Sequence, residues 1–244
     1  MRKTFLACSL ILNLVLIAGG LLFVLKRDFV KRFIPSFSTQ TATTVYIESP
    51  HYLGRKDVYE NLPRKESQII FAGDSMIDFC EWSELIERPV IKRGINGDTV
   101  KGLRLRIDGM LRDKPQKLFI MVGIGDLVYG KTVDEVKTEY QELIKTIQTT
   151  SPQTQIYLHS LLPANRALRQ SELPKNLEND IIEVNRFLKE KADGKNTVFL
   201  DLYPQFVDDK KQLKNEYTID GVHLNGQGYL KWRDILRPYI SADK

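Results

Sequence analysis

The chain has 244 residues, of which 42% are hydrophobic and 27% are charged, and its formal net charge is +5. These proportions are typical of a globular protein that is long enough to bury a sizeable core. Lysine and arginine are scattered along the chain and form no stripe with aromatic residues, which argues against a nucleic-acid partner. The two cysteines, Cys8 and Cys80, lie far apart in the sequence and predict no disulfide framework.

The N-terminal part of the chain begins with a short basic start and an uncharged apolar run, 4–25. A membrane-spanning helix needs about 20 apolar residues, so this run is long enough to cross a bilayer. A cleaved signal peptide is the alternative, but the apolar run continues beyond the small residues 18–20 where cleavage would be expected. We therefore expect residues 1–33 to form an uncleaved membrane anchor with a basic flank.

The orientation of this anchor is not fixed by charge, because basic residues flank both ends of the apolar run. A short positive N-terminus before a long domain is the usual arrangement of a signal anchor. We expect a single-pass membrane protein whose catalytic domain lies outside the cytoplasm. The Ser/Thr-rich stretch 34–50 is expected to be a polar linker, followed by one domain over 51–244.

In that domain, short apolar runs alternate with longer amphipathic ones. The apolar runs have the length and composition of strands buried on both faces, and they are 68–72, 89–92, 117–122, 155–161 and 197–202. Apolar residues at helical spacing predict helices over 133–149, 177–191 and 227–240. The alternation predicts an α/β fold with a parallel sheet, whose functional site lies at the carboxyl ends of the strands.

The first and last loops of this scheme carry candidate catalytic residues. Ser75 ends a Gly-Asp-Ser triplet directly after the first strand, where glycine allows a tight turn at the sheet edge. The last loop, 220–225, places Asp220 three residues before His223. A serine nucleophile needs a base that takes its proton and a carboxylate that orients the base. Helix caps also use Asp and Ser, and a loop histidine can be structural, so neither loop decides the role alone.

The loop after the second strand, 93–99, could complete such a site. Gly97 could turn its backbone N–H into the site, and Asp98 or Thr99 would cap the following helix. The Asn-Gly pair is also ordinary turn chemistry. Two other residues are expected to be buried structural ones: His159 in an apolar strand, and Cys80, which has no partner at metal-ligand spacing.

Taken in order, these motifs resemble those of the SGNH, or GDSL, hydrolase family over about residues 51–240. The order is Gly-Asp-Ser, Arg-Gly-Ile-x-Gly-Asp-Thr, Gly-x-x-Asp after a strand, and Asp-Gly-x-His-Leu-Asn. The chain is similar to the branch that includes the catalytic subunit of platelet-activating-factor acetylhydrolase and bacterial acylesterases. The resemblance implies a flavodoxin-like three-layer α/β/α sandwich around a five-stranded parallel sheet.

The resemblance also implies residue roles. Ser75 would be the nucleophile, His223 the general base and then the general acid, and Asp220 the carboxylate that orients His223. The backbone N–H groups of Ser75 and Gly97 would donate hydrogen bonds to the oxyanion. No metal or organic cofactor is implied.

One family motif departs from its pattern in this chain. The family has Gly-x-Asn-Asp, whose Asn side chain donates to the oxyanion, and residues 123–126 place Gly125 at that position. One lost oxyanion donor typically costs about 10²- to 10³-fold in rate. Asn96 is a candidate for a replacement donor. A catalytically weakened or silent binding module is the alternative, whereas the three retained triad positions favour an active enzyme.

The sequence therefore predicts a serine esterase that hydrolyses short-chain acyl esters through an acyl-enzyme. A carbohydrate O-acetyl group or a lysophospholipid would suit a domain tethered near a membrane. Acyl transfer to another alcohol would use the same residues.

Overall fold

The computed structural model describes residues 46–63, 68–112, 114–169 and 172–240. The expected anchor at 1–33 and most of the expected linker lie outside these residues. In the part of the chain that is described, no helix has the length and apolar character needed to cross a membrane.

Five strands form one parallel sheet in the order β2-β1-β3-β4-β5. Their bounds are β1 (Ile69–Gly73), β2 (Ile91–Gly94), β3 (Lys117–Met121), β4 (Gln155–His159) and β5 (Thr197–Leu200). Each apolar run of the sequence contributes one strand, so the predicted five-stranded parallel sheet is confirmed. Gly73 of β1 pairs with Gly94 of β2 and Met121 of β3, which brings the carboxyl ends of these strands to one edge.

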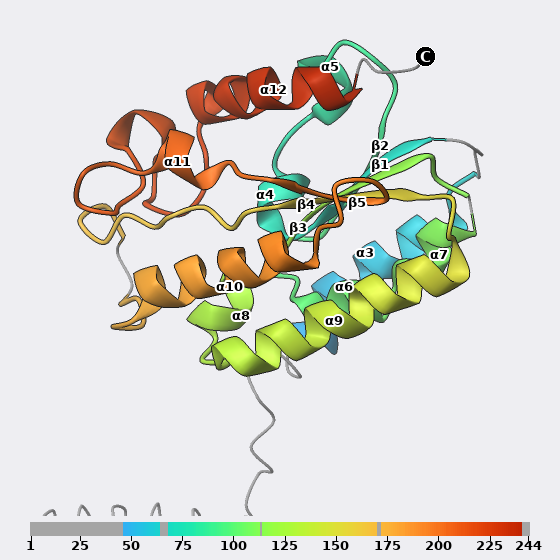
Figure 1. Cartoon of the computed structure of the whole chain (residues 1–244), viewed down its shortest axis with the longest axis horizontal. Helices are drawn as coiled ribbons and strands as arrows, with labels where there is room; N and C mark the ends of the chain where they lie inside the picture. Colours follow the sequence, from blue (N-terminus) through green and yellow to red (C-terminus); the bar gives the residue numbers. More distant parts are fainter. Residues whose placement is uncertain (1–45, 64–67, 113, 170–171, 241–244) are drawn as a thin grey trace, which may run out of the picture. The chain divides into compact units, whose positions relative to one another are not determined.

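Both faces of the sheet are buried because successive side chains point to opposite sides. Ile70 and Ala72 belong to one core cluster, whereas Ile69 and Phe71 belong to the other. Helices α5 (Trp82–Leu85) and α12 (Gly226–Ile240) cover one face. Helices α6 (Val100–Arg104), α7 (Ile107–Leu111), α9 (Val133–Thr150) and α10 (Leu177–Lys191) cover the other (Figure 1). The expected three-layer sandwich is therefore confirmed.

Two of the longer helices, α9 and α12, begin at side-chain caps. Thr132 and Glu135 form a reciprocal capping box at the start of α9. The Asn225 side chain accepts from the Gly228 N–H at 3.0 Å and so caps the start of α12. The remaining elements are short: α4 (Ser75–Asp78), α8 (Ile124–Val128), α11 (Tyr203–Phe206) and a 3-10 turn (Asn215–Tyr217).

Helix α3 (Pro50–Asn61) is an element that the hydrophobic pattern does not predict. The Ser49 hydroxyl accepts from the Tyr52 N–H at 3.2 Å, and Pro50 occupies the first turn. The Tyr52 hydroxyl donates to the Gly102 carbonyl oxygen at 2.7 Å and fixes α3 against α6. Tyr46, in the expected linker, contacts the ring of Tyr52 edge to face with a centroid distance of 6.0 Å.

The strand order positions the functional site. It is the flavodoxin-like order, in which ligands bind outside the carboxyl ends of the strands where the order reverses. Here that point lies between the carboxyl ends of β1 and β3.

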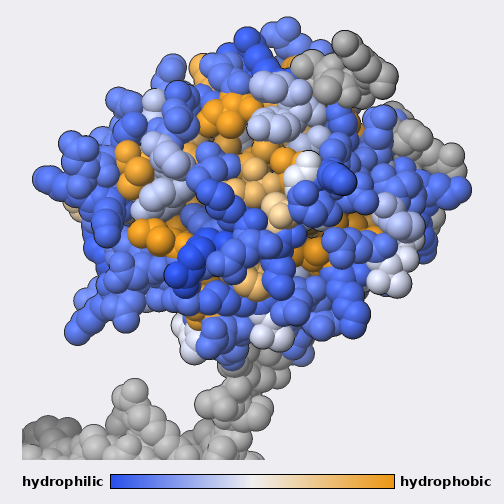
Figure 2. Space-filling model, viewed as in Figure 1, coloured by the Kyte–Doolittle hydropathy of each residue, from blue (hydrophilic) through white to orange (hydrophobic). Residues whose placement is uncertain are grey.

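Figure 2 shows hydrophilic side chains over most of one face of the molecule, with apolar side chains in separate patches.

Candidate active site

Ser75 is presented at the carboxyl edge of the sheet by a tight turn after β1. Gly73 has φ +156°, and a Cβ at this position would overlap the backbone carbonyl of Met121 on the neighbouring strand. Asp74 caps the short helix α4 by accepting from the Met76 N–H at 3.0 Å. Of the two residues in this turn that could cap a helix, Asp74 is the cap, and Ser75 is the first residue of the helix.

His223 lies between Ser75 and Asp220. Its Nε2 is 3.0 Å from the Ser75 Oγ, and its Nδ1 is 2.7 Å from the Asp220 Oδ2. The second carboxylate oxygen of Asp220 accepts from the backbone N–H groups of Val222 and His223 at 2.9 and 2.8 Å. The structure therefore brings Ser75 next to His223, which lies 148 positions later in the sequence, and places Asp220 on the other side of the imidazole ring.

The hydrogen bonds to Asp220 keep its carboxyl ionised. Partial burial raises its pKa, but the hydrogen bonds from the His223 ring and from the N–H groups of His223 and Val222 outweigh burial. The net pKa lies below the usual value for Asp. An ionised carboxylate at this position can orient the imidazole ring and stabilise its protonated form.

Two backbone N–H groups beside Ser75 are available to a ligand. Within the described residues, neither the Ser75 N–H nor the Gly97 N–H donates to a protein acceptor. Gly97 adopts φ +80°, in the left-handed region that favours glycine. Asn96 is exposed, and its backbone N–H donates to the Asp78 carboxylate at 3.0 Å. The Asn96 side chain remains a candidate donor, since it makes no hydrogen bond to the described part of the chain.

A buried ion pair fixes the loop that holds Gly97. The Arg106 Nε donates to the Asp98 Oδ2 at 2.9 Å, and both side chains are almost completely buried. Burial raises the pKa of Asp98 to about 6, although the Arg106 charge and hydrogen bond lower it. Of the two residues expected to cap the next helix, Thr99 does so by accepting from the Gly102 N–H at 3.1 Å.

Gly125 lies beside this loop and has close neighbours on the side where a side chain would begin. A Cβ at Gly125 would meet the Asp98 carbonyl oxygen at 3.3 Å and the Tyr129 ring at 3.5 Å. Asp126 has a structural role, because its Oδ2 accepts from the Val100 N–H at 2.9 Å and its Oδ1 is 2.9 Å from the Lys131 Nζ. No side-chain amide therefore enters the site from position 125.

These residues line a cleft of about 200 Å³. Ser75, His223 and Gly97 line it together with Gly125 and Asn96. Apolar side chains form another part of its wall: Ile124, Val128, Leu173 and Val222. Among the residues whose placement is described, no group of three or more His, Cys, Asp or Glu could hold a metal ion.

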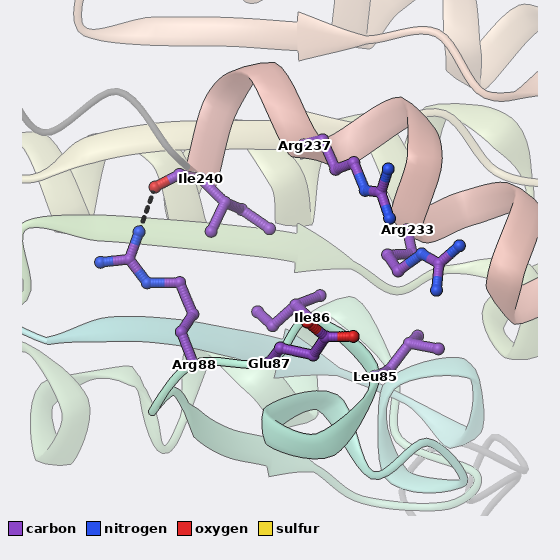
Figure 3. Close-up of a pocket in the computed structure, with 7 residues that line it drawn as sticks. All are labelled: Leu85, Ile86, Glu87, Arg88, Arg233, Arg237 and Ile240. Carbon is purple, nitrogen blue, oxygen red and sulfur yellow. Dashed lines mark hydrogen bonds between the residues drawn. The ribbon is translucent and has the colours of Figure 1, made fainter.

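A second cavity of about 320 Å³ lies away from this cleft, between α5 and the end of α12 (Figure 3). It is lined by Leu85, Ile86, Glu87, Arg88, Arg233, Arg237 and Ile240. The Arg88 Nη1 donates to the carbonyl oxygen of Ile240 at 2.5 Å, which closes one end of it. It contains none of the residues that the sequence motifs single out, so the smaller cleft is the candidate active site.

The two expected structural residues lie in the core. His159 is fully buried, and its Nδ1 is 3.1 Å from the Ile120 carbonyl oxygen. Burial lowers the pKa of His159 to about 3, so the ring is neutral at physiological pH. Cys80 is a buried free thiol.

Two residues in the cleft were not indicated by any motif. The Arg169 Nη1 donates to the Asp220 Oδ2 at 3.2 Å, the same oxygen that faces His223. Tyr129 follows α8 and is 39% exposed in the cleft wall. Tyr129 lies four residues after Gly125, a spacing that places two residues side by side on a helix, so the sequence could have indicated their contact. Nothing in the sequence indicates that Arg169 would reach Asp220.

Comparison with known proteins gives the same family as the motifs. The sequence model of the GDSL-like lipase/acylhydrolase family matches residues 73–231. The chain belongs to this family. It is 30% identical over 175 residues to the platelet-activating factor acetylhydrolase IB subunit alpha2 of Rattus norvegicus, an alignment that covers 68% of this chain and 73% of that protein.

Solved structures agree with the GDSL assignment. A protein described as a candidate platelet activating factor from Streptococcus pneumonia superposes with a TM-score of 0.71 at 27% identity, covering 78% of this chain and 92% of that one. A candidate acylhydrolase from Bacteroides fragilis has a TM-score of 0.68 at 22% identity, covering 79% and 97%, and supports the fold alone. The chain is therefore an acylhydrolase of the GDSL type, with a small-molecule ester as the class of substrate that the family implies.

Proposed function

We propose that the chain is a serine esterase in which Ser75, His223 and Asp220 act as a catalytic triad. The observation that carries this proposal is the continuous row of short contacts, 3.0 Å from Ser75 Oγ to His223 Nε2 and 2.7 Å from Nδ1 to Asp220 Oδ2. Both distances lie within hydrogen-bond reach, which is the geometry that a base needs to accept a serine proton.

The reaction takes place in two steps. The Ser75 Oγ attacks the ester carbonyl carbon and forms a C–O bond, while its proton moves to the His223 Nε2. Collapse of the oxyanion breaks the bond to the leaving alcohol, which takes the proton from Nε2. Water then attacks the acyl-enzyme by the same route, so the carboxylic acid leaves and the proton returns to Ser75.

The oxyanion is stabilised by backbone donors in this proposal. Ser75 and Gly97 line the cleft, and their N–H groups have no acceptor among the described residues, so they can donate to the developing negative charge. The Arg106–Asp98 ion pair holds the Gly97 loop in place, since Arg106 Nη2 also donates to the Gly73 carbonyl oxygen at 3.1 Å. Such donors are effective because they need no reorganisation during the reaction.

We further propose that the acyl group is short. The cleft of about 200 Å³ is smaller than the pockets of roughly 300–1,000 Å³ that hold drug-sized ligands. Its apolar wall suits an acetyl or similarly small acyl group. The curated relatives are acetylhydrolases by name, which supports the same choice. The leaving alcohol would be a carbohydrate hydroxyl or a lysophospholipid.

The test is hydrolysis of p-nitrophenyl esters of increasing chain length by the purified full-length chain. We expect the acetate to be the preferred substrate and the Ser75→Ala variant to lose turnover. Ser83→Ala is the matched control, because Ser83 is exposed on α5 and lies outside the cleft. Equal rates for the wild type and Ser75→Ala would contradict the proposal.

Gly125 favours a second candidate function, a silent binding module. The absence of a side-chain donor at this position removes a contribution worth about 10²- to 10³-fold in rate. Binding of an acetylated glycan without hydrolysis, unchanged in Ser75→Ala, would support this second function.

We also propose that residues 1–33 anchor the protein in a membrane, with the hydrolase domain outside the cytoplasm. The support is the apolar run 4–25 in the sequence. Loss of membrane association on deletion of residues 1–33, together with protease access from the outside of intact cells, is the expected result. Full retention in the soluble fraction by the intact chain would contradict it.

A further inference from the structure

The position of Gly125 raises the question of which group occupies the space of the missing amide. Gly125 lies in α8, and Tyr129 follows one turn later, with its N–H donating to the Gly125 carbonyl oxygen at 2.8 Å. Side chains on a helix lean toward its N-terminus, so a residue covers the surface of the turn before it. Tyr129 is therefore placed to cover Gly125.

The contact of Tyr129 with position 125 is direct. A Cβ at Gly125 would lie 3.5 Å from the Tyr129 Cε2, the ring atom next to the carbon that bears the hydroxyl. Tyr129 lines the same cleft as Ser75 and Gly97. Its hydroxyl makes no hydrogen bond with the described residues, and the side chain is 39% exposed. A residue that lines the cleft therefore carries an O–H group with no described protein partner.

A neighbouring aromatic residue holds the Tyr129 ring. Tyr46 stacks on Tyr129 with a centroid distance of 6.4 Å and an interplanar angle of 26°. The same Tyr46 ring fills the space beside Gly97, where an added Cβ would lie 2.5 Å from it. Tyr46 thus contacts both the proposed backbone donor loop and Tyr129, which restricts the relative position of the two.

The electrostatic surroundings keep the Tyr129 hydroxyl protonated. Burial raises its pKa above the usual value, and the nearby charges of Asp74 and Asp126 raise it further, whereas Arg169 opposes them. A protonated hydroxyl can donate to negative charge, and tyrosine is one of the side chains that oxyanion holes use.

We propose that the Tyr129 hydroxyl donates a third hydrogen bond to the oxyanion, in place of the side-chain amide that Gly125 cannot supply. Tyr129 is then a catalytic residue that contacts the reacting carbonyl oxygen. This inference rests on the proposed esterase function, because it requires an oxyanion on the substrate of Ser75.

The experiment compares Tyr129→Phe with the wild-type full-length chain in two assays, p-nitrophenyl acetate hydrolysis and the rate of Ser75 labelling by a fluorophosphonate. We expect Tyr129→Phe to lower kcat and the labelling rate by about a hundred- to a thousandfold with little change in KM, as for removal of one oxyanion donor. Tyr239→Phe is the matched control, because Tyr239 lies at the far end of α12 and outside the cleft.

Restoration of the amide provides the second arm. Gly125→Asn in the Tyr129→Phe background is expected to recover about tenfold or more in kcat, because the new side chain can donate from the position that the family uses. Gly125→Asn in the wild-type background is expected to change kcat much less. Failure of a folded double variant to recover activity would overturn the proposal.

The remaining outcomes separate this inference from the proposed function. If Ser75→Ala abolishes turnover but Tyr129→Phe stays within about twofold of the wild type in both assays, the esterase stands and the role of Tyr129 is wrong. If the wild type neither hydrolyses the ester nor reacts with the fluorophosphonate, both the esterase function and the role of Tyr129 are wrong.

Discussion

Replacement of Arg106 by Met tests the buried ion pair that supports the loop of Gly97. The Arg106 side chain is 2% exposed and that of Asp98 is fully buried. Arg106 Nε donates to the Asp98 Oδ2 at 2.9 Å, and Nη2 lies 2.7 Å from the same oxygen. Nη1 donates to the Arg93 carbonyl oxygen at 2.9 Å, so one guanidinium ties together the ends of β1 and β2 and the loop.

The expected loss of stability follows from the unpaired Asp98 carboxylate in the Arg106→Met variant. Met keeps an apolar stem but leaves the Asp98 carboxylate buried without its partner, and such a loss costs about 3–5 kcal/mol. The free energy of unfolding of a native domain is only about 5–15 kcal/mol, so a loss of this size is large. We expect urea unfolding, followed by circular dichroism at pH 8, to show a free energy of unfolding lower by about 3–5 kcal/mol.

The loss should depend on pH in a defined direction. The folded-state pKa of Asp98 is already raised to about 6 by burial, and removal of Arg106 takes away a group that lowers it. The variant therefore continues to lose stability as pH rises above 6, whereas at pH 5 Asp98 takes up a proton and much of the loss disappears. Equal losses at pH 5 and pH 8, or a loss below about 1 kcal/mol at pH 8, would refute the reasoning.

The double variant provides the control. Asp98→Asn together with Arg106→Met removes both charges, so its loss should be smaller than the sum of the two single losses by about 1–3 kcal/mol. Strict additivity would show that the two side chains do not interact as the structure indicates.

Further predictions concern three other residues. Burial raises the pKa of Asp74 to about 7, although the Met76 N–H lowers it, so folding loses stability as pH rises toward 7. Asp74→Asn keeps the helix cap but removes the charge, so its Tm should exceed that of the wild type by a wider margin at pH 8 than at pH 5. The margin should widen by several degrees, at about 2–4 °C per kcal/mol. An equal difference in Tm at both pH values would refute this. Arg169→Met should lower kcat for p-nitrophenyl acetate, because Asp220 loses the hydrogen bond that the Arg169 Nη1 donates at 3.2 Å to the oxygen facing His223; an unchanged kcat would show that this contact does not help to position Asp220. Burial raises the pKa of Cys80 to about 12, so this thiol should react with a maleimide only after denaturation, as followed by mass spectrometry of the Cys80 peptide.

The sheet could be predicted from the sequence because its strands are buried on both faces. A strand such as β3 is a continuous apolar run between polar segments, which leaves little choice of assignment. Helix α10 has the same bounds, 177–191, in the prediction and in the structure. Helix α3 was missed because its apolar residues form no clear stripe, although Ser49 and Pro50 are a recognisable start signal.

The candidate site could be predicted only in part. Ser75, Asp220 and His223 stand in short motifs whose order is specific, and the structure brings them within hydrogen-bond distance. The contact of Arg169 with Asp220 joins residues 51 positions apart in two loops, and no periodicity or motif marks such a pair. Tyr46 illustrates the same limit, since its packing against Gly97 depends on how the chain enters the fold.

The central claim is that Ser75 is the nucleophile and His223 its base, and the most direct measurement is mapping of the covalent adduct. The full-length chain is treated with a fluorophosphonate, digested and analysed by mass spectrometry, beside the His223→Ala variant. The account predicts a single adduct on Ser75 that forms much more slowly in His223→Ala. Labelling at other serines only, or equal rates at Ser75 with and without His223, would contradict it.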